Sequence, residues 1–296
     1  MLLNKDFKPM LLTEQDKPFD NDNYLFELKY DGMRVLAYIQ KGKVELINRR
    51  GNIVTKRFPE IVEGLSVIKE NCVLDGEIIA IKDGKPNFNM LQKRLFLKDL
   101  SKIKVQSIKN PVMLVIFDVL YYKESCLDKP LLERKEIIKE KFKEIKNTVI
   151  SEYVIGEGKK LYEFAINQDL EGIVAKVKNS AYIMGKRTNA WIKIKNINEA
   201  DFIIGGYIPN KGDMASLALG EKTKQGLKYV GNVTIGKSRP DFEVISNVPI
   251  LDKSPFINKV SGVTFIEPKL RCTIKYLERT ETGGIRHAVY KGLRFD

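Results

Sequence analysis

The sequence predicts a two-domain α+β protein, in which a mixed domain of strands and helices precedes a small β-barrel. Two observations lead to this fold class. Residues 1–198 alternate apolar strands with amphipathic helices, whereas residues 199–296 contain short strands separated by glycine turns. In addition, a chain of 296 residues is long enough to form two separate cores. We therefore place the domain boundary between residues 198 and 199.

The first domain begins with strands and then alternates strands with helices. The dipeptide Lys41-Gly42 separates two alternating runs and is a hairpin signal. Strands are expected at 24–29, 35–40, 43–48, 72–81, 111–120, 172–177 and 191–195. Helices are expected at 59–70, 89–99, 131–146 and 160–170, where apolar residues recur at helical spacing. The lysine run of the helix at 131–146 is interpreted as a solvated face.

In the second domain the helical periodicity nearly disappears. Strands are expected at 201–207, 216–219, 228–235, 262–266, 269–276 and 285–290. About a hundred residues of short strands with glycine turns favour a small barrel, for which the OB-fold is the main candidate.

Composition narrows the functional classes. The net charge of +13 suggests a polyanionic partner, although solubility would also explain it. No apolar run is long enough for a membrane span, and the first residues lack a secretory signal, so we expect a cytoplasmic protein, nucleoid-associated in a prokaryote. Cys72, Cys126 and Cys272 are interpreted as buried reduced thiols. The single histidine, His287, excludes a multi-histidine metal site and leaves lysines and carboxylates for the chemistry.

Charged residues interrupt several strands that should otherwise be core. Buried ions need partners, so several of them on successive strands predict one shared charged cleft. Carboxylates and lysines without histidine suit magnesium and a polyphosphate. The residues concerned are Glu77, Asp118, Glu171, Lys176, Lys193 and Lys195. The alternative for Lys193 and Lys195 is the exposed face of an edge strand.

Lys29 is the candidate nucleophile. Partial burial beside Phe26, Leu28 and Tyr30 would favour the free amine that attack on phosphorus requires. Gly32, three residues later, would let the backbone approach a bound nucleotide. So short a pattern also fits a strand that runs into a turn.

A second nucleotide motif is present in the barrel. Residues Gly231 to Ser238 match the P-loop pattern G-x-x-x-x-G-K-[ST]. However, Val233 and Ile235 alternate as in a strand, and no helical pattern starts at Lys237. We interpret the match as coincidental.

Five motifs follow one another along the chain: Lys29-Tyr30-Asp31-Gly32-Met33-Arg34, Leu74-Asp75-Gly76-Glu77, Phe117-Asp118-Val119-Leu120-Tyr121, Glu171-Gly172-Ile173-Val174-Ala175-Lys176 and Trp191-Ile192-Lys193-Ile194-Lys195. Together they resemble a known family, the ATP-dependent DNA ligases of the covalent nucleotidyltransferase superfamily, and most of all the ligase module of bacterial end-joining DNA ligases. Their order along the chain is that of the family, and the resemblance covers essentially the whole sequence. It implies an ATP-grasp-like nucleotidyltransferase domain, with antiparallel sheets flanked by helices, followed by an OB-fold.

The resemblance implies that the reaction passes through a lysyl-AMP intermediate. Lys29 would attack the α-phosphate of ATP and release pyrophosphate, while Asp31 would position the reacting groups. Lys193 and Lys195 would bind the α-phosphate oxygens and offset charge as the phosphorus is attacked. AMP would then pass to the 5′-phosphate of a DNA nick, and the neighbouring 3′-hydroxyl would displace it.

The resemblance also implies the residues that hold the nucleoside. Glu27 and Phe117 would bind adenine, Phe117 by stacking. Glu77 would bind the ribose, and Arg34 and Arg49 would contact the ribose or the 5′-phosphate of the nick.

The remaining implied ligands contact phosphates or metal. Lys176 would also bind the α-phosphate, and Glu171 with Glu77 would hold Mg²⁺ or Mn²⁺. Arg294 lies in an OB segment that, in the family, swings over the nucleotide to orient the leaving pyrophosphate. The family pattern there is Arg-x-Asp-Lys, but no lysine follows Asp296 in the sequence; we expect this departure to slow the first step.

The expected cofactors are therefore ATP and a divalent cation, and the expected partner is nicked double-stranded DNA. We expect a monomer that does not bind membranes; end-joining or repair proteins are further candidate partners. RNA ligases and capping enzymes share the lysine motif and remain alternatives, and preferential labelling by GTP would favour a capping-type enzyme. A P-loop NTPase would form no covalent adduct, and a non-catalytic OB protein would not need Lys29.

Overall fold

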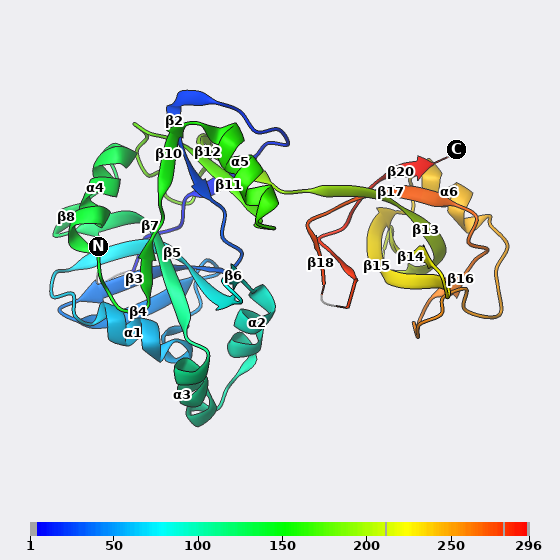
Figure 1. The fold of residues 1–296 in the computed structure, drawn as a ribbon, viewed down its shortest axis with the longest axis horizontal. Helices are drawn as coiled ribbons and strands as arrows, with labels where there is room; N and C mark the ends of the chain where they lie inside the picture. Colours follow the sequence, from blue (N-terminus) through cyan, green and yellow to red (C-terminus); the bar gives the residue numbers. More distant parts are fainter. Residues whose placement is uncertain (1–4, 211, 281, 295–296) are drawn as a thin grey trace. The chain divides into compact units, whose positions relative to one another are not determined.

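The computed structural model describes residues 5–210, 212–280 and 282–294. Its contacts divide the chain into two compact units, Met1–Asn196 and Ile197–Asp296 (Figure 1). This division lies two residues before the expected boundary. Within the described residues, no helix is long and apolar enough to cross a membrane.

The first unit contains two sheets, which we call sheet 1 and sheet 2. Sheet 1 has the strand order β1-β12-β11-β2-β10. Neighbouring strands are antiparallel except β1 and β12, which are parallel. Its strands are β1 (Leu11–Glu14), β2 (Asn21–Leu28), β10 (Tyr153–Gly156), β11 (Gly172–Val177) and β12 (Arg187–Lys195).

Sheet 2 has the order β4-β3-β5-β7-β8, with β6 paired to β5 and β9 to β7. The hairpin expected around Lys41-Gly42 is formed by β3 and β4, which pair from Gln40↔Lys43 to Val35↔Asn48. The strands are β3 (Met33–Gln40), β4 (Lys43–Asn48), β5 (Cys72–Lys82), β6 (Lys85–Pro86), β7 (Val112–Tyr122), β8 (Glu124–Ser125) and β9 (Thr148–Ile150).

Helices cover the outer faces of both sheets (Figure 1). Apolar residues of α1, α2 and α4 pack on sheet 2, whereas Ala165 of α5 packs on Phe26 and Ile194 of sheet 1. A third apolar cluster, which includes Leu36 and Trp191, joins the two sheets. The helices are α1 (Pro59–Leu65), α2 (Phe88–Phe96), α3 (Leu100–Lys109), α4 (Leu131–Lys141) and α5 (Gly158–Asn167), with the short 3₁₀ turn η1 (Thr55–Arg57).

The second unit is the expected small barrel. Its main sheet has the order β15-β14-β13-β17-β20, and β15 also contacts β20, so the sheet curls around one apolar core (Figure 1). The elements are β13 (Asn198–Pro209), β14 (Met214–Thr223), β15 (Gly226–Gly236), α6 (Pro240–Ser246), β16 (Thr264–Phe265), β17 (Arg271–Tyr276), β18 (Glu278–Arg279), β19 (Ile285–Arg286) and β20 (Val289–Arg294).

Four helices differ from the sequence prediction. The helix expected at 59–70 ends at Leu65. The helix expected at 131–146 ends at Lys141, because Glu144 and Asn147 have positive φ angles that a right-handed helix cannot contain. Helices α3 and α6 were not predicted. The signal for α3 is Asp99, whose carboxylate accepts hydrogen bonds from the backbone N–H groups of Ser101 and Lys102 as an N-cap.

The P-loop pattern in the barrel does not form a phosphate loop. Residues Gly231 to Gly236 lie in β15 and pair with β14 through Gly236↔Met214. The Lys237 ammonium donates to the carbonyl oxygens of Asn210 and Gly212, and α6 begins only at Pro240. The match is therefore coincidental, as the sequence context predicts.

Candidate active site

Strand register brings the charged residues of sheet 1 onto one face. Glu27 lies opposite Val174, which in turn lies opposite Lys193. Because side chains alternate between the two faces of a strand, Lys176 and Lys195 share that face. The lysines that interrupt apolar strands are thus brought together by register.

Sheet 2 supplies the opposite wall. Arg34 and Glu77 are neighbours across β3 and β5. Asp75 of β5 pairs with Asp118 of β7, and the next residue of β5, Gly76, pairs with Ile116. Phe117 of β7 is therefore the extra residue of a β-bulge. A bulge redirects the side chain that it carries.

A cavity lies between these walls. From sheet 1 it is lined by residues of β1, β2, β11 and β12, and from sheet 2 by Arg34, Glu77 and Phe117. The lining residues are Leu12, Glu27, Leu28, Lys29, Tyr30, Arg34, Glu77, Phe117, Val174, Lys176 and Trp191. Seven expected site residues, Lys29 and Glu171 included, meet at or beside this cavity.

Lys29 and Glu171 form the central contact. The Lys29 Nζ lies 2.6 Å from Glu171 Oε2, and the two side chains are 21% and 11% exposed. The backbone N–H of Lys29 donates to the carbonyl oxygen of Gly172, which places the end of β2 beside the start of β11. Gly172 has φ = +132°, and a Cβ there would lie 2.1 Å from the carbonyl oxygen of Ile194. Only glycine fits this position.

Glu27 is the centre of a buried ionic cluster. Its carboxylate accepts from Lys176 at 3.0 Å, from Lys135 at 2.5 Å and from the Ser151 hydroxyl at 2.9 Å. The Lys176 ammonium also lies 4.2 Å from the ring centroid of Trp191. Two buried cations thus share one carboxylate, so the cluster keeps excess positive charge at the cavity.

The ammonium of Lys176 lies 4.6 Å from the Phe117 ring centroid. Burial lowers the pKa of Lys176 to about 8, with Lys135 acting in the same direction and Glu27 opposing. The folded state therefore releases this proton at a lower pH than the unfolded chain does.

We expect this difference to appear as a pH-dependent stability. Between pH ~8 and ~10.4 the unfolded chain keeps a proton on Lys176 that the folded chain has lost, so this residue makes stability rise with pH. The free energy of unfolding of the wild type, relative to that of Lys176→Met, should therefore be larger at pH 9.5 than at pH 7. Denaturant unfolding at both values measures it; a pH-independent difference would contradict the assignment.

Two of the charged residues serve buried networks. Arg34 binds both carboxylate oxygens of Asp75, at 2.9 and 2.6 Å, and Tyr182 donates to the same carboxylate at 2.6 Å. Asp118 was expected in the shared cleft, but its carboxylate is fully buried and bonded to Arg134. That prediction is wrong, because a bidentate pair satisfies Asp118 away from the cavity.

Glu77 and Glu171 are the two expected metal ligands. Burial raises the pKa of Glu77 to about 8, against the opposing effect of Lys29 and Arg34. Within the described residues no three His, Cys, Asp or Glu side chains cluster as a metal site. Mg²⁺ commonly uses one or two carboxylates together with substrate phosphates, so this donor set fits it.

The other expected site residues lie in different places. Lys193 and Lys195 both pair with Glu14, at 2.8 and 3.6 Å. Asp31 follows β2 and is half-buried. Arg49 is exposed in the turn after β4 and does not line the cavity. Arg294 lies in the second unit, 3.4 Å from Asp201; the following residues, 295 and 296, lie outside the described part of the chain.

Sequence reasoning missed several residues of the site. Lys135 belongs to the lysine run that was interpreted as a solvated face, but it is 3% exposed and bonded to Glu27. The spacing of Leu131, Lys135 and Ile138, which are all buried, is the signal that could have identified it. Glu14 offered no comparable signal.

Nucleotide transfer to an enzyme needs a nucleophile, an apolar surface for the base and cations for the phosphates. An amine (Lys29), an aromatic ring (Phe117) and a buried cation (Lys176) lie around one cavity, and a small barrel follows. The fold and the site thus define a nucleotidyltransferase domain joined to an OB-fold domain, as the sequence predicts.

Comparison with known families gives the particular family. A model of the ATP dependent DNA ligase domain matches residues 9–195, and a model of the ATP dependent DNA ligase C terminal region matches residues 210–296. The chain therefore belongs to the ATP-dependent DNA ligase family, and the predicted resemblance and fold class are confirmed.

Individual relatives agree with the family. The multifunctional non-homologous end joining protein LigD of Mycolicibacterium smegmatis is 30% identical over 308 residues, which cover 99% of this chain but 39% of LigD. The prophage-derived DNA ligase-like protein LigB of Bacillus subtilis is 31% identical, covering 97% of this chain and 98% of LigB. A structure of mycobacterial DNA ligase D complexed with ATP and MES has a TM-score of 0.59 and 27% identity, covering 98% and 96% of the two chains.

Proposed function

We propose that this protein seals nicks in duplex DNA through a lysyl-AMP intermediate formed on Lys29. The observation that carries the proposal is the contact of 2.6 Å between Lys29 and Glu171 beside a cavity that Phe117 and Lys176 also line. Family membership supports the reaction class, and the site supports the choice of nucleophile.

In the first step the amine of Lys29 attacks the α-phosphorus of ATP. The bond from the α-phosphorus to the bridging oxygen of the β-phosphate breaks, pyrophosphate leaves, and a phosphoramidate bond to AMP forms. The amine must lose a proton to attack, and Glu171 lies within hydrogen-bond distance to accept it. Bound magnesium would neutralise phosphate charge, and Glu171 and Glu77 are the carboxylates that would hold it.

The rest of the cavity positions the nucleotide. Phe117, redirected by its bulge, offers a ring on which adenine can stack. Lys176, Lys193 and Lys195 lie on one face of sheet 1 and would offset the charge that develops on the α-phosphate. To contact the α-phosphate, Lys193 and Lys195 must break their ion pairs with Glu14.

In the following steps AMP passes to the 5′-phosphate of the nick, and the 3′-hydroxyl displaces it. The test of the whole proposal is incubation with α-labelled ATP or GTP and magnesium, followed by denaturing electrophoresis and by sealing of a nicked duplex. Covalent label from ATP together with sealing supports the proposal. Preferential label from GTP, or release of ADP without an adduct, would overturn it.

We predict that Arg49→Ala spares self-adenylation but slows sealing by about ten-fold or more, the cost of one bidentate phosphate contact. Arg49 is exposed and lies outside the cavity, where its guanidinium is accessible to the 5′-phosphate of a nick. Single-turnover rates of both steps measure the effect, with Lys17→Ala, a change of another exposed cation, as control. Equal loss in both steps would refute this role.

A further inference from the structure

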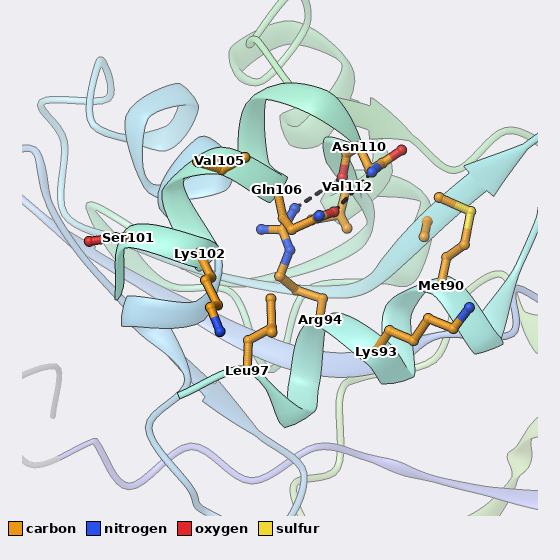
Figure 2. A pocket seen from close by; sticks show the side chains of 11 residues that line it. Met90, Lys93, Arg94, Leu97, Ser101, Lys102, Val105, Gln106, Asn110 and Val112 are labelled. Atoms are coloured by element: carbon orange, nitrogen blue, oxygen red, sulfur yellow. Dashed lines mark hydrogen bonds between the residues drawn. The ribbon is translucent and has the colours of Figure 1, made fainter. Parts of the chain in front are cut away.

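A groove on the first unit lies apart from the nucleotide cavity. It runs between α2 and α3, has a volume of about 590 Å³, and shares no lining residue with the candidate active site (Figure 2). Its walls carry Lys93 on α2 and Lys102 on α3, with the apolar side chain of Leu97 between them and that of Val105 farther along α3 (Figure 2). A second hollow, lined in part by Ile53 and Leu100, adjoins the same helix connection.

The floor of the groove is rigid. Arg94 is 4% exposed, pairs with Glu60 at 3.1 Å, and donates to the carbonyl oxygens of Arg57 and Asn110. Because both terminal nitrogens of this guanidinium are bonded to the fold, Arg94 fixes the floor of the groove without a ligand. A preformed groove loses little entropy when a partner binds.

The two helices beside the groove also carry large apolar side chains that are exposed to solvent. Phe96 and Ile108 are each 74% exposed, Leu100 is 59% exposed and Val105 is 49% exposed. All four belong to α2 and α3. Large exposed apolar side chains gathered on one pair of helices, among polar residues, favour an interaction surface.

The rim is strongly basic. Residues 93–109 contain six lysines and arginines and one acid, Asp99. Within the described part of the chain, no ion pair is found for the ammonium groups of Lys93, Lys98 and Lys102. Their charges are therefore available to an anionic partner.

We propose that this groove, formed by α2 and α3, binds an acidic amphipathic segment of a partner protein. Such a segment would place apolar side chains against Leu97 and Val105 and carboxylates against Lys93 and Lys102. Duplex DNA would satisfy the lysines but offers no comparable apolar surface to cover Leu97 and Val105. A second copy of this chain would bring the same lysines face to face.

The test selects short peptides from a phage-displayed random library on the full chain and measures the affinity of the enriched peptides by fluorescence anisotropy. We expect acidic peptides with aromatic or branched aliphatic anchors. Their affinity should fall about ten-fold or more in Lys93→Glu/Lys102→Glu and in Val105→Asp. The matched control is Lys139→Glu/Lys143→Glu, an equal charge change on exposed lysines in the last turn of α4 and just after it. It should change affinity by less than about two-fold.

Absence of enriched peptides, enrichment without acidic residues, or equal loss in the control would overturn the proposal. So would a ten-fold weaker binding of nicked duplex by Lys93→Glu/Lys102→Glu without any enriched peptide, which would make the groove a DNA surface. Self-adenylation should stay normal in every variant, so failure of this inference is distinguishable from failure of the proposed function.

Discussion

Lys29→Arg is expected to abolish covalent labelling by ATP, with a rate at least about 10⁴-fold below wild type. A guanidinium stays protonated at all accessible pH values and cannot attack phosphorus, yet it preserves the positive charge beside Glu171. Loss of label in this variant therefore reports loss of the nucleophile rather than loss of the ion pair. Denaturing electrophoresis after incubation with α-labelled ATP measures the rate.

Two further measurements make this result decisive. Lys29→Ala should also lose the label, but it leaves Glu171 without its cation and is expected to be less stable than Lys29→Arg. Both variants should still act on nicked DNA that already carries the adenylate, because the last step needs no lysine nucleophile. Label retained in a folded Lys29→Arg protein would refute the assignment.

Much of the architecture follows from local pattern. The strand β11 occupies the residues that its apolar run predicts, and β3 and β4 meet at the predicted turn. These elements are determined by alternation and turn chemistry, which the sequence displays directly. Helix α3 is absent from the sequence prediction because only three residues separate it from α2. The pattern of residues 88–109 therefore predicts one helix followed by a loop.

The site was predictable as a set of residues but not as a set of contacts. Alternation places Lys176 and Lys193 on one face, yet it does not say that this face meets a second sheet rather than solvent. The bulge at Phe117 depends on how β5 and β7 pair, which is a property of the sheet. Lys135 reaches Glu27 from α4, a contact between residues more than a hundred positions apart that no local spacing encodes.

The contacts of Glu27 change the expectation for that residue. The resemblance assigns it to adenine, but its oxygens already accept from Lys135, Lys176 and Ser151. A carboxylate has room for about four donors, so little capacity remains for a base. In this structure Glu27 is the counter-ion of two cations at the cavity wall, and its contact with adenine stays a prediction.

The second large effect is expected for Glu27→Ala, which should lower the free energy of unfolding of the first unit by about 3–5 kcal/mol. Removing the carboxylate leaves Lys135 and Lys176, both at most 3% exposed, without a counter-ion in an apolar setting. The matched control is Glu157→Ala, which breaks a glutamate–lysine pair of 2.8 Å to Lys160 on the exposed surface of the same unit and should cost less than about 1 kcal/mol. Urea unfolding followed by circular dichroism measures both variants.

Raising the pH should recover part of the lost stability in Glu27→Ala only, because Lys176 then loses its charge. If Glu27→Ala and Glu157→Ala cost the same, the buried cluster does not stabilise the fold and the role assigned to Glu27 fails.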